Sequence, residues 1–152
     1  MVIADTFRCP TTNPNYQAID NICYYFETKP KTYDDAKQNC NTKFTQGKLF
    51  EPKSLASNKK VYLAALDTKN IDWWLGINDK RNKGSWVYDS DGSSIAFSIP
   101  WYPGEPSGGH DVENESSGDY CVQYWNTPKN MIGLWDDYTC STAVASICEQ
   151  IV

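Results

Sequence analysis

Residues 105–137 hold Glu105-Pro106-Ser107, then Asp119-Tyr120-Cys121, then Trp135-Asp136-Asp137, and the rest of the chain is best understood from them. The carboxylates are spread along the sequence, but a bridge between Cys121 and Cys140 would bring the last two segments together. Side-chain oxygens would then converge from several loops, which is the ligand set that a hard divalent cation such as Ca²⁺ prefers. The competing interpretation is a solvated acidic surface, because Asp and Glu are mostly exposed. The accompanying Pro, Trp and Cys residues favour the cation site.

Length and composition fit one domain over residues 1–152, which is long enough to bury a real core. Aromatic residues make up 14% of the chain, and Tyr and Trp serve both cores and recognition surfaces. The net charge of −5 comes without a basic stripe, which argues against a nucleic-acid partner. No run of apolar residues approaches the length of a membrane-spanning helix, so we expect no membrane span.

Six cysteines at scattered spacing predict three disulfides and an oxidising compartment, so we expect a secreted, extracellular protein. Their spacing alone leaves the pairing open. No Cys-x-x-Cys pair occurs, which argues against a zinc knuckle. Residues 1–8 are too short and too polar for a signal peptide, so we interpret Met1 as an initiator ahead of a mature chain or an added start. The cysteines are Cys9, Cys23, Cys40, Cys121, Cys140 and Cys148.

The hydrophobic pattern predicts two early helices followed by a strand-rich half, which makes an α+β domain. Thr32 is a good N-cap for the first helix, and Ser54 or Ser57 can cap a second helix over about 57–67. Residues 93–118 carry little secondary-structure signal, and a loop of this length inside a compact domain is usually functional or disordered. The predicted strands cover residues 22–26, 73–77, 86–88, 120–125, 132–135 and 143–149.

Taken in order, these segments resemble the C-type lectin domain, and the match covers nearly the whole chain. The residues that carry it are Cys23-Tyr24-Tyr25-Phe26, the helix ending in Cys40, Trp74-Leu75-Gly76-Ile77, Trp101-Tyr102-Pro103-Gly104-Glu105-Pro106, Cys121-Val122, Trp135-Asp136-Asp137 with Cys140, and Ile147-Cys148-Glu149. Similarity to the long form of this family implies two helices, small antiparallel sheets, a long calcium-binding loop region and three disulfides. The implied pairs are Cys9–Cys23, Cys40–Cys148 and Cys121–Cys140.

The resemblance also implies one Ca²⁺ site, at which two vicinal sugar hydroxyls complete the shell of the ion. Family members use a Glu-Pro-Asn or Gln-Pro-Asp tripeptide, an acid two residues before a cysteine, and a Trp-Asn-Asp tripeptide. Carried over by position, the expected metal ligands are Glu105, Ser107, Asp119, Asp136 and Asp137. The expected sugar-binding residues are Glu105, Ser107, Asp119 and Asp136, together with His110 and Tyr102.

Two positions of the implied site depart from the family pattern. Ser107 stands where Asn or Asp is usual, and its hydroxyl is shorter but can donate or accept a hydrogen bond. Asp136 stands where Asn is usual, and an ionised Asp cannot donate to a sugar hydroxyl. The family's auxiliary calcium site also looks damaged, because Asp79 is in place but Lys83 occupies the position of an acid. We expect that second site to be empty.

The leading interpretation is a calcium-dependent lectin that binds glycans and is not an enzyme. The single histidine, His110, is more typical of a solvated or sugar-contacting side chain than of a catalytic base, since a base needs a positioned partner. A sugar-independent protein-binding module of the same fold is the alternative. A non-covalent homo-oligomer stays open, because three intrachain pairs would leave no cysteine for a bridge between chains.

Two signals disagree on the sugar class. In the family, Glu105 followed by Pro accompanies mannose- or glucose-type ligands, whereas an extended Gly-rich loop, as found after Ser107, resembles those of galactose binders. Such a loop holds an aromatic ring against the apolar face of the sugar. We favour galactose or N-acetylgalactosamine, on the strength of the loop and of the adaptable Ser107 hydroxyl. The candidate rings are Tyr102, His110, Tyr124 and Trp125.

Overall fold

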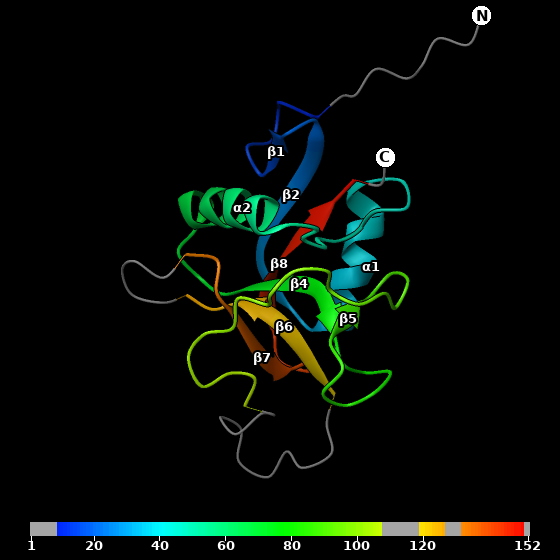
Figure 1. Ribbon diagram of the computed structural model, residues 1–152. Helices are drawn as coiled ribbons and strands as arrows, with labels where there is room; N and C mark the ends of the chain where they lie inside the picture. The colour runs from blue at the N-terminus through cyan, green and yellow to red at the C-terminus, as the bar shows by residue number, and fades with distance from the viewer. Residues whose placement is uncertain (1–8, 108–118, 127–131, 151–152) are drawn as a thin grey trace, which may run out of the picture.

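The computed structural model describes residues 9–107, 119–126 and 132–150, and Figure 1 shows two helices beside a twisted sheet. This is the α+β arrangement that the sequence predicts, with both helices in the first half of the chain. In chain order the elements are β1 (Tyr16–Ile19), β2 (Ile22–Lys31), α1 (Tyr33–Lys43), β3 (Lys48–Leu49), α2 (Leu55–Thr68), β4 (Trp73–Asn78), β5 (Val87–Tyr88), β6 (Tyr120–Tyr124), β7 (Trp135–Thr139) and β8 (Val144–Glu149).

The eight strands belong to one connected sheet, where the resemblance implied several small ones. Their order is β1-β2-β8-β4-β6-β7, with β3 attached to β8 and β5 attached to β4. Neighbouring strands are antiparallel except β4 and β8, which run parallel and join the two halves of the sheet. The parallel pair arises because β8 returns to the centre of the sheet, where every one of its residues is buried.

Capping residues define the start of both helices. The Thr32 hydroxyl accepts a hydrogen bond from the Asp35 N–H (3.3 Å), and the Ser54 hydroxyl accepts one from the Ser57 N–H (3.0 Å). Thr32 therefore caps α1 as predicted, and of the two candidate serines it is Ser54 that caps α2. The second helix consequently begins at Leu55, ahead of the predicted start.

Three disulfides hold the elements together, and their pairing is the one that the resemblance implies. One ties the N-terminal segment to the β1–β2 hairpin, whose turn places Asp20 and Asn21 at positive φ, as a tight hairpin requires. The second fastens α1 to β8, and the third joins the start of β6 to the residue that follows β7. The pairs are Cys9–Cys23, Cys40–Cys148 and Cys121–Cys140.

Hydrophobic clusters lie on both faces of the sheet, and β4 contributes to each. Successive side chains of a strand point to opposite faces. Trp73 accordingly packs in the cluster that includes α2, and Trp74 packs in the cluster that includes α1. Every residue of β4 is buried, which confirms the interpretation of this run as core.

Asn58, from α2, is a buried polar residue that binds the ends of β6 and β7. Its amide donates to the Gly133 carbonyl (2.9 Å), and its Oδ1 accepts from the Tyr124 hydroxyl and the Trp135 indole N–H (2.8 Å each). Gly133 has a φ of 69°, so the backbone turns there before the strand starts. The predicted strand over 132–135 therefore has the wrong bounds, since β7 begins at Trp135.

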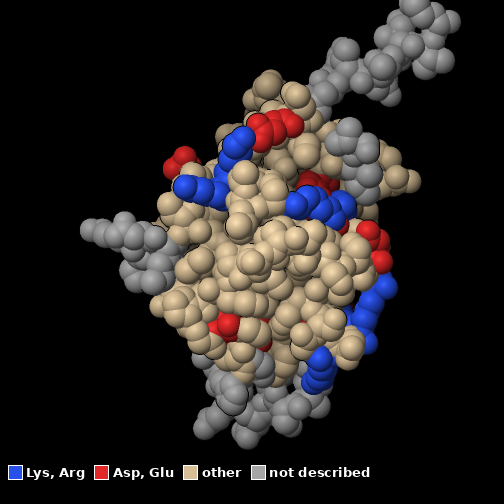
Figure 2. Space-filling view, in the orientation of Figure 1, with Lys and Arg blue, Asp and Glu red and all other residues tan. Residues whose placement is uncertain are grey.

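The described part of the predicted loop region, residues 93–107, carries only isolated bridges and no helix or strand. Within the described ranges, no helix combines the length and the apolar character needed to cross a membrane. Figure 2 shows Lys and Arg side chains scattered among acidic ones on the face in view, without a basic stripe.

Candidate metal centre

A tight turn brings Glu105 to the beginning of β7. The Glu105 N–H donates to the Tyr102 carbonyl (2.8 Å), and Gly104 lies at a φ of 92°. Pro103 at the second position of the turn and a positive-φ Gly at the third are what a type II turn requires. The segment is fastened to the sheet just before the turn, because the Tyr102 N–H donates to the carbonyl of Trp135 (2.9 Å).

The other two carboxylates come from β7 itself. Asp136 and Asp137 are 2% and 0% exposed, and the preceding Trp135 is buried in the core. Alternation sends neighbouring side chains of a strand to opposite faces. Both carboxylates nevertheless lie near the Glu105 carboxylate. This is possible because β7 is the last strand in the sheet order, and the segment that carries Glu105 runs along its outer edge.

Glu105, Asp136 and Asp137 each place one carboxylate oxygen within 4.8 Å of the others. In the part of the chain that the structure describes, this is the one such group of three or more acidic, His or Cys side chains. Ser107 adjoins it, since its N–H donates to Glu105 Oε2 (2.7 Å) and to Asp137 Oδ1 (2.9 Å). The peptide between Glu105 and Pro106 is cis.

Burial and mutual repulsion oppose ionisation of this group. Burial raises the pKa of Asp136 to about 7, and the charges of Glu105 and Asp137 add to the effect. A hydrogen bond from the Gln123 amide to Asp136 Oδ2 (2.9 Å) acts in the opposite direction. Burial, followed by the contact with Asp137, also raises the pKa of Glu105. Three carboxylates held this close make their charged forms unfavourable unless a cation joins them.

The residues present fit a hard divalent cation such as Ca²⁺. The gathered side chains offer carboxylate oxygens, with the Ser107 hydroxyl beside them, and Asp136 Oδ1 is buried without a hydrogen-bond partner. Leaving a buried polar atom unpaired is costly. A bound cation would coordinate that oxygen and offset the repulsion. Glu105, Asp136 and Asp137 would supply the side-chain ligands.

The remaining predicted site residues lie outside this group. Asp119 is exposed and is not one of the gathered carboxylates. Its carbonyl accepts from the Cys140 N–H (3.2 Å), so its backbone is fixed beside the Cys121–Cys140 bridge. His110 lies outside the described residues.

The candidate stacking rings have different environments. Tyr102 and Trp125 are half-buried and pack together with ring centroids 4.4 Å apart, so both rings keep some exposed surface. Of the four candidate rings, Tyr124 is excluded, because this ring is 0% exposed and its hydroxyl binds Asn58. The sequence pattern did not show that Tyr124 is on the core face of β6.

Sequence reasoning missed Gln123, which holds Asp136 from the neighbouring strand. The two residues are directly opposite in the antiparallel pairing of β6 and β7. Residues at such positions have side chains in contact. The expected Cys121–Cys140 bridge aligns the two strands only approximately, because Cys121 pairs with Tyr138 and not with Cys140, so the sequence carried no signal precise enough to identify Gln123.

Asp79, from the expected auxiliary site, is 4% exposed. One of its oxygens accepts from the Gly84 N–H (3.0 Å), and the other has no hydrogen-bond partner. Within the described ranges it gathers with no pair of other acidic side chains. Lys83 lies with its Nζ 5.8 Å from the centre of the Tyr120 ring. That the auxiliary site is empty stays a prediction.

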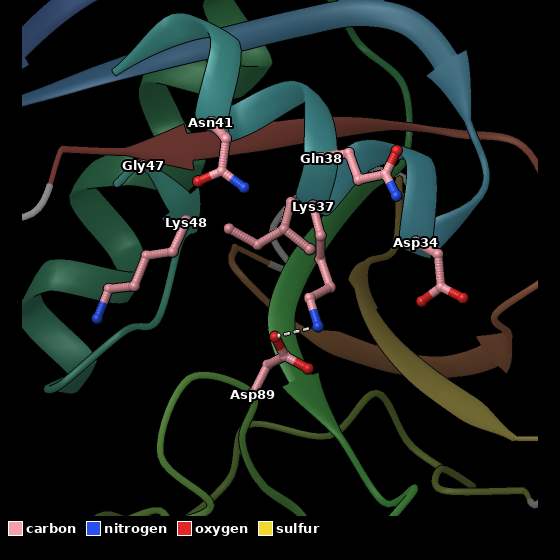
Figure 3. A pocket seen from close by; sticks show the side chains of 8 residues that line it. Asp34, Lys37, Gln38, Asn41, Gly47, Lys48 and Asp89 are labelled. Carbon is pink, nitrogen blue, oxygen red and sulfur yellow. Dashed lines mark ion pairs between the residues drawn. The ribbon is translucent and has the colours of Figure 1, made fainter. Parts of the chain in front are cut away.

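A separate pocket of about 330 Å³ lies between α1 and the segment around Leu49, as Figure 3 shows. An ion pair between Lys37 and Asp89 (2.9 Å) stands at its border. Asp34, at the rim, is also paired, with Lys80 (3.0 Å). None of the predicted site residues lines this pocket, so it gives no support to a sugar site there.

Comparison with known proteins identifies the fold family. A family model described as the Lectin C-type domain matches residues 29–150, which is most of the chain. The chain belongs to the C-type lectin family. The family is calcium-dependent in general, and its members are generally binding modules without enzymatic activity.

Relatives of this lectin include proteins of similar length. It is 30% identical over 153 residues to C-type lectin BfL-2 from Bungarus fasciatus, covering 96% of the chain and 85% of that protein. It is 26% identical over 152 residues to an alpha-N-acetylgalactosamine-specific lectin from Patiria pectinifera, covering 95% and 84%. These relatives support carbohydrate binding.

Among solved structures, the lectin resembles the human scavenger receptor C-type lectin carbohydrate-recognition domain. The TM-score is 0.74 at 22% sequence identity, and the match covers 91% of this chain and 98% of that domain. At this identity the likeness shows the fold.

Proposed function

We propose that this lectin binds carbohydrate through a calcium ion held by Glu105, Asp136 and Asp137. The observation that carries the proposal is the group itself, with carboxylate oxygens within 4.8 Å of one another and one buried oxygen of Asp136 unpaired. Calcium takes about 6–8 oxygen ligands. Three carboxylates therefore leave room in the shell for two vicinal hydroxyls of a sugar.

The side chains of the site can contact the sugar in three ways. Glu105, Asp119 and Asp136 can accept hydrogen bonds from sugar hydroxyls whose oxygens face the ion, because ionised carboxylates only accept. The Ser107 hydroxyl can donate or accept, so it adapts to hydroxyls of either orientation. Asp119 is proposed as a ligand on its position beside the Cys121–Cys140 bridge. Tyr102 and His110 are proposed to contact the sugar ring.

Galactose or N-acetylgalactosamine is the ligand class that we favour. An axial 4-hydroxyl leaves one face of the galactose ring apolar, and aromatic rings pack well against such a face. Tyr102 and Trp125 form a half-buried aromatic pair that begins three residues before Glu105 in the sequence. The relative from Patiria pectinifera, named for its N-acetylgalactosamine specificity, agrees with this class. Mannose-type ligands, favoured by Glu105-Pro106, are the alternative.

The test is a glycan-binding assay in calcium and in chelator, with galactose and mannose as competitors. We expect binding only in calcium, loss of binding in Glu105→Ala and Asp136→Ala, and retention in the control Asp67→Ala, an exposed acid on α2. Undiminished glycan binding in excess EDTA would refute the calcium site. Inhibition by mannose well below the inhibitory concentration of galactose would overturn the sugar class alone.

We further propose that residues 1–152 act as one secreted recognition domain with no catalytic activity. Three disulfides suit an oxidising, extracellular compartment. Carboxylates that ligate a cation are poor general acids, because the cation holds them deprotonated. Turnover of any oligosaccharide by the purified protein would contradict this assignment.

A further inference from the structure

The loop between β4 and β5, residues 79–86, carries a pair of basic side chains that has no part in the metal centre. The pair is Lys80-Arg81. The chain has two pairs of adjacent basic residues in all, and the other pair, Lys59-Lys60, lies in the middle of α2. Two adjacent basic side chains are complementary to a protease whose binding pockets are acidic. The two pairs share this chemistry and differ in their structural setting.

The backbone on both sides of the bond between Arg81 and Asn82 is exposed and lies outside any helix or strand. Among the residues that the structure describes, neither the Arg81 N–H nor the Asn82 N–H has a hydrogen-bond acceptor. Two short contacts close the loop, from the Gly84 N–H to Asp79 Oδ2 (3.0 Å) and from the Ser85 N–H to the Asn82 carbonyl (2.9 Å). Exposed loop tips with small or polar residues are preferred sites of proteolytic cleavage.

The side chains of the loop pair are held by weak contacts. Lys80 pairs with Asp34 on α1 (3.0 Å), which is 75% exposed, and its Nζ is 5.2 Å from the centre of the Tyr33 ring. Exposed ion pairs and cation–π contacts contribute little to stability. Arg81 lies against Gly92, where a Cβ would collide with its guanidinium, and it forms no ion pair with a described residue. Opening of the loop therefore breaks few contacts of either side chain.

The helical pair is protected by the element that carries it. Lys59 and Lys60 lie between Asn58 and Val61, both of which are buried. An extended conformation at this pair would require unwinding of α2 and loss of the bond from the Asn58 amide to the Gly133 carbonyl (2.9 Å). A protease cuts an opened segment at a rate set by how often that segment opens. The loop pair should accordingly be cut much faster than the helical pair.

We propose that Lys80-Arg81 is a processing site, at which a protease specific for paired basic residues hydrolyses the bond between Arg81 and Asn82. Water adds across this bond. Its oxygen joins the Arg81 carbonyl carbon to make a carboxylic acid, and the Asn82 nitrogen leaves as an amine. The proton that the acid gives up is taken up by this amine, so the two new chain ends carry opposite charges.

Cleavage at this bond leaves the two parts of the chain joined. One disulfide lies within residues 1–81 and one within residues 82–152, so Cys40–Cys148 becomes the only covalent link between the parts. Strand pairing also crosses the cut, since β4 pairs with β6 and with β8. The product is a folded two-chain protein, with both helices in the first chain and the three proposed calcium ligands in the second.

The test is limited digestion of the native protein, in calcium, by an endoprotease that cuts after paired basic residues. The reduced, alkylated and unfolded chain is digested in parallel, and the rate at each pair in the native protein is divided by the rate at that pair in the unfolded chain. We expect this normalised rate to be about a hundred times higher at Arg81 than at Lys60. In denaturing electrophoresis without reductant the product should run as one molecule, heavier by the mass of one water. Reductant should separate it into residues 1–81 and 82–152.

Two double variants locate the cut. Lys80→Gln with Arg81→Gln removes the proposed site, and Lys59→Gln with Lys60→Gln is the matched control on α2. We expect the first to abolish the two fragments and the second to leave their rate of formation unchanged. Equal normalised rates at the two pairs would show that cleavage follows global unfolding and would overturn the proposal. Resistance of native Arg81 while the unfolded chain is cut there, or a cut protein without a cooperative urea transition, would overturn it as well.

Discussion

Replacing Asp136 by Asn should stabilise the calcium-free protein, although it removes a proposed metal ligand. The pKa of Asp136 is raised from an ordinary value of 3.8 to about 7 by burial and by its acidic neighbours. The folded state therefore binds a proton that the unfolded state releases between these pH values, and stability falls as pH rises through that window. At pH 8 the charged side chain costs as much as about 4 kcal/mol, since each unit of pKa is worth about 1.36 kcal/mol.

An Asn side chain removes that cost without leaving the position unfilled. Its oxygen can accept from Gln123 as Asp136 Oδ2 does, and its amide can donate toward Glu105 or Asp137 in place of the unpaired Oδ1. In chelator at pH 8 we expect Asp136→Asn to raise the free energy of unfolding by about 2–4 kcal/mol. At pH 5 the gain should shrink by more than half, because Asp136 is then largely protonated.

The assay is urea unfolding in chelator and in saturating calcium. Calcium at a thousand times its Kd would add about 4 kcal/mol to the parent protein, and less to the variant, so the gap should close or reverse in calcium. The control Asp67→Asn changes charge equally at an exposed site and should stay within about 0.5 kcal/mol. An Asp136→Asn protein that is no more stable than the parent in chelator at pH 8 would refute the reasoning.

Three further predictions concern stability. Burial raises the pKa of Glu149 to about 7, so the stability that this residue contributes is lost as pH rises from 5 to 8. In the Asp136→Asn background, Glu149→Gln should reduce that loss by up to about 3 kcal/mol. An unchanged dependence of the free energy of unfolding on pH, measured by urea unfolding, would contradict this. The double variant Cys40→Ala, Cys148→Ala removes a disulfide that closes a loop of sequence separation 108, and it should lower the free energy of unfolding by about 4–5 kcal/mol, measured from the denaturant midpoint. A loss under about 1 kcal/mol would show that strand pairing holds the domain together without this disulfide. Asn58→Ala breaks three buried side-chain hydrogen bonds and should cost about 3 kcal/mol or more in the same assay; a cost below about 1 kcal/mol would mean that the partners find new bonds.

Local chemistry allowed much of the fold to be predicted from sequence. Thr32 marks the start of α1 because its hydroxyl satisfies a free N–H, and the apolar run over 73–77 can only be core. The disulfide pairing came from the resemblance, because spacing alone leaves it open. The start of β7 was missed because it depends on Gly133, whose bond to Asn58 is a tertiary contact that the local pattern does not contain.

The candidate site was predicted in part. Glu105, Asp136 and Asp137 come together as expected, since the Pro-Gly turn and the strand both have local signatures. Gln123 was missed, and Tyr124 was kept among the candidate rings, for one reason: the sequence shows alternation along β6 but not which of its faces packs against α2. That choice is made by packing against α2.

The three proposed calcium ligands are attached to the sheet in two different ways. The backbones of Asp136 and Asp137 are fixed by the pairing of β7 with β6. Glu105 lies beyond the last backbone bond to β7, which Tyr102 makes, and the segment is next fastened at Ser107, whose N–H donates to Asp137 Oδ1 (2.9 Å). We expect release of a bound calcium ion to begin with breaking of the Ser107 contact, while β6 and β7 stay paired. Residence time at the site and global stability should respond to different mutations.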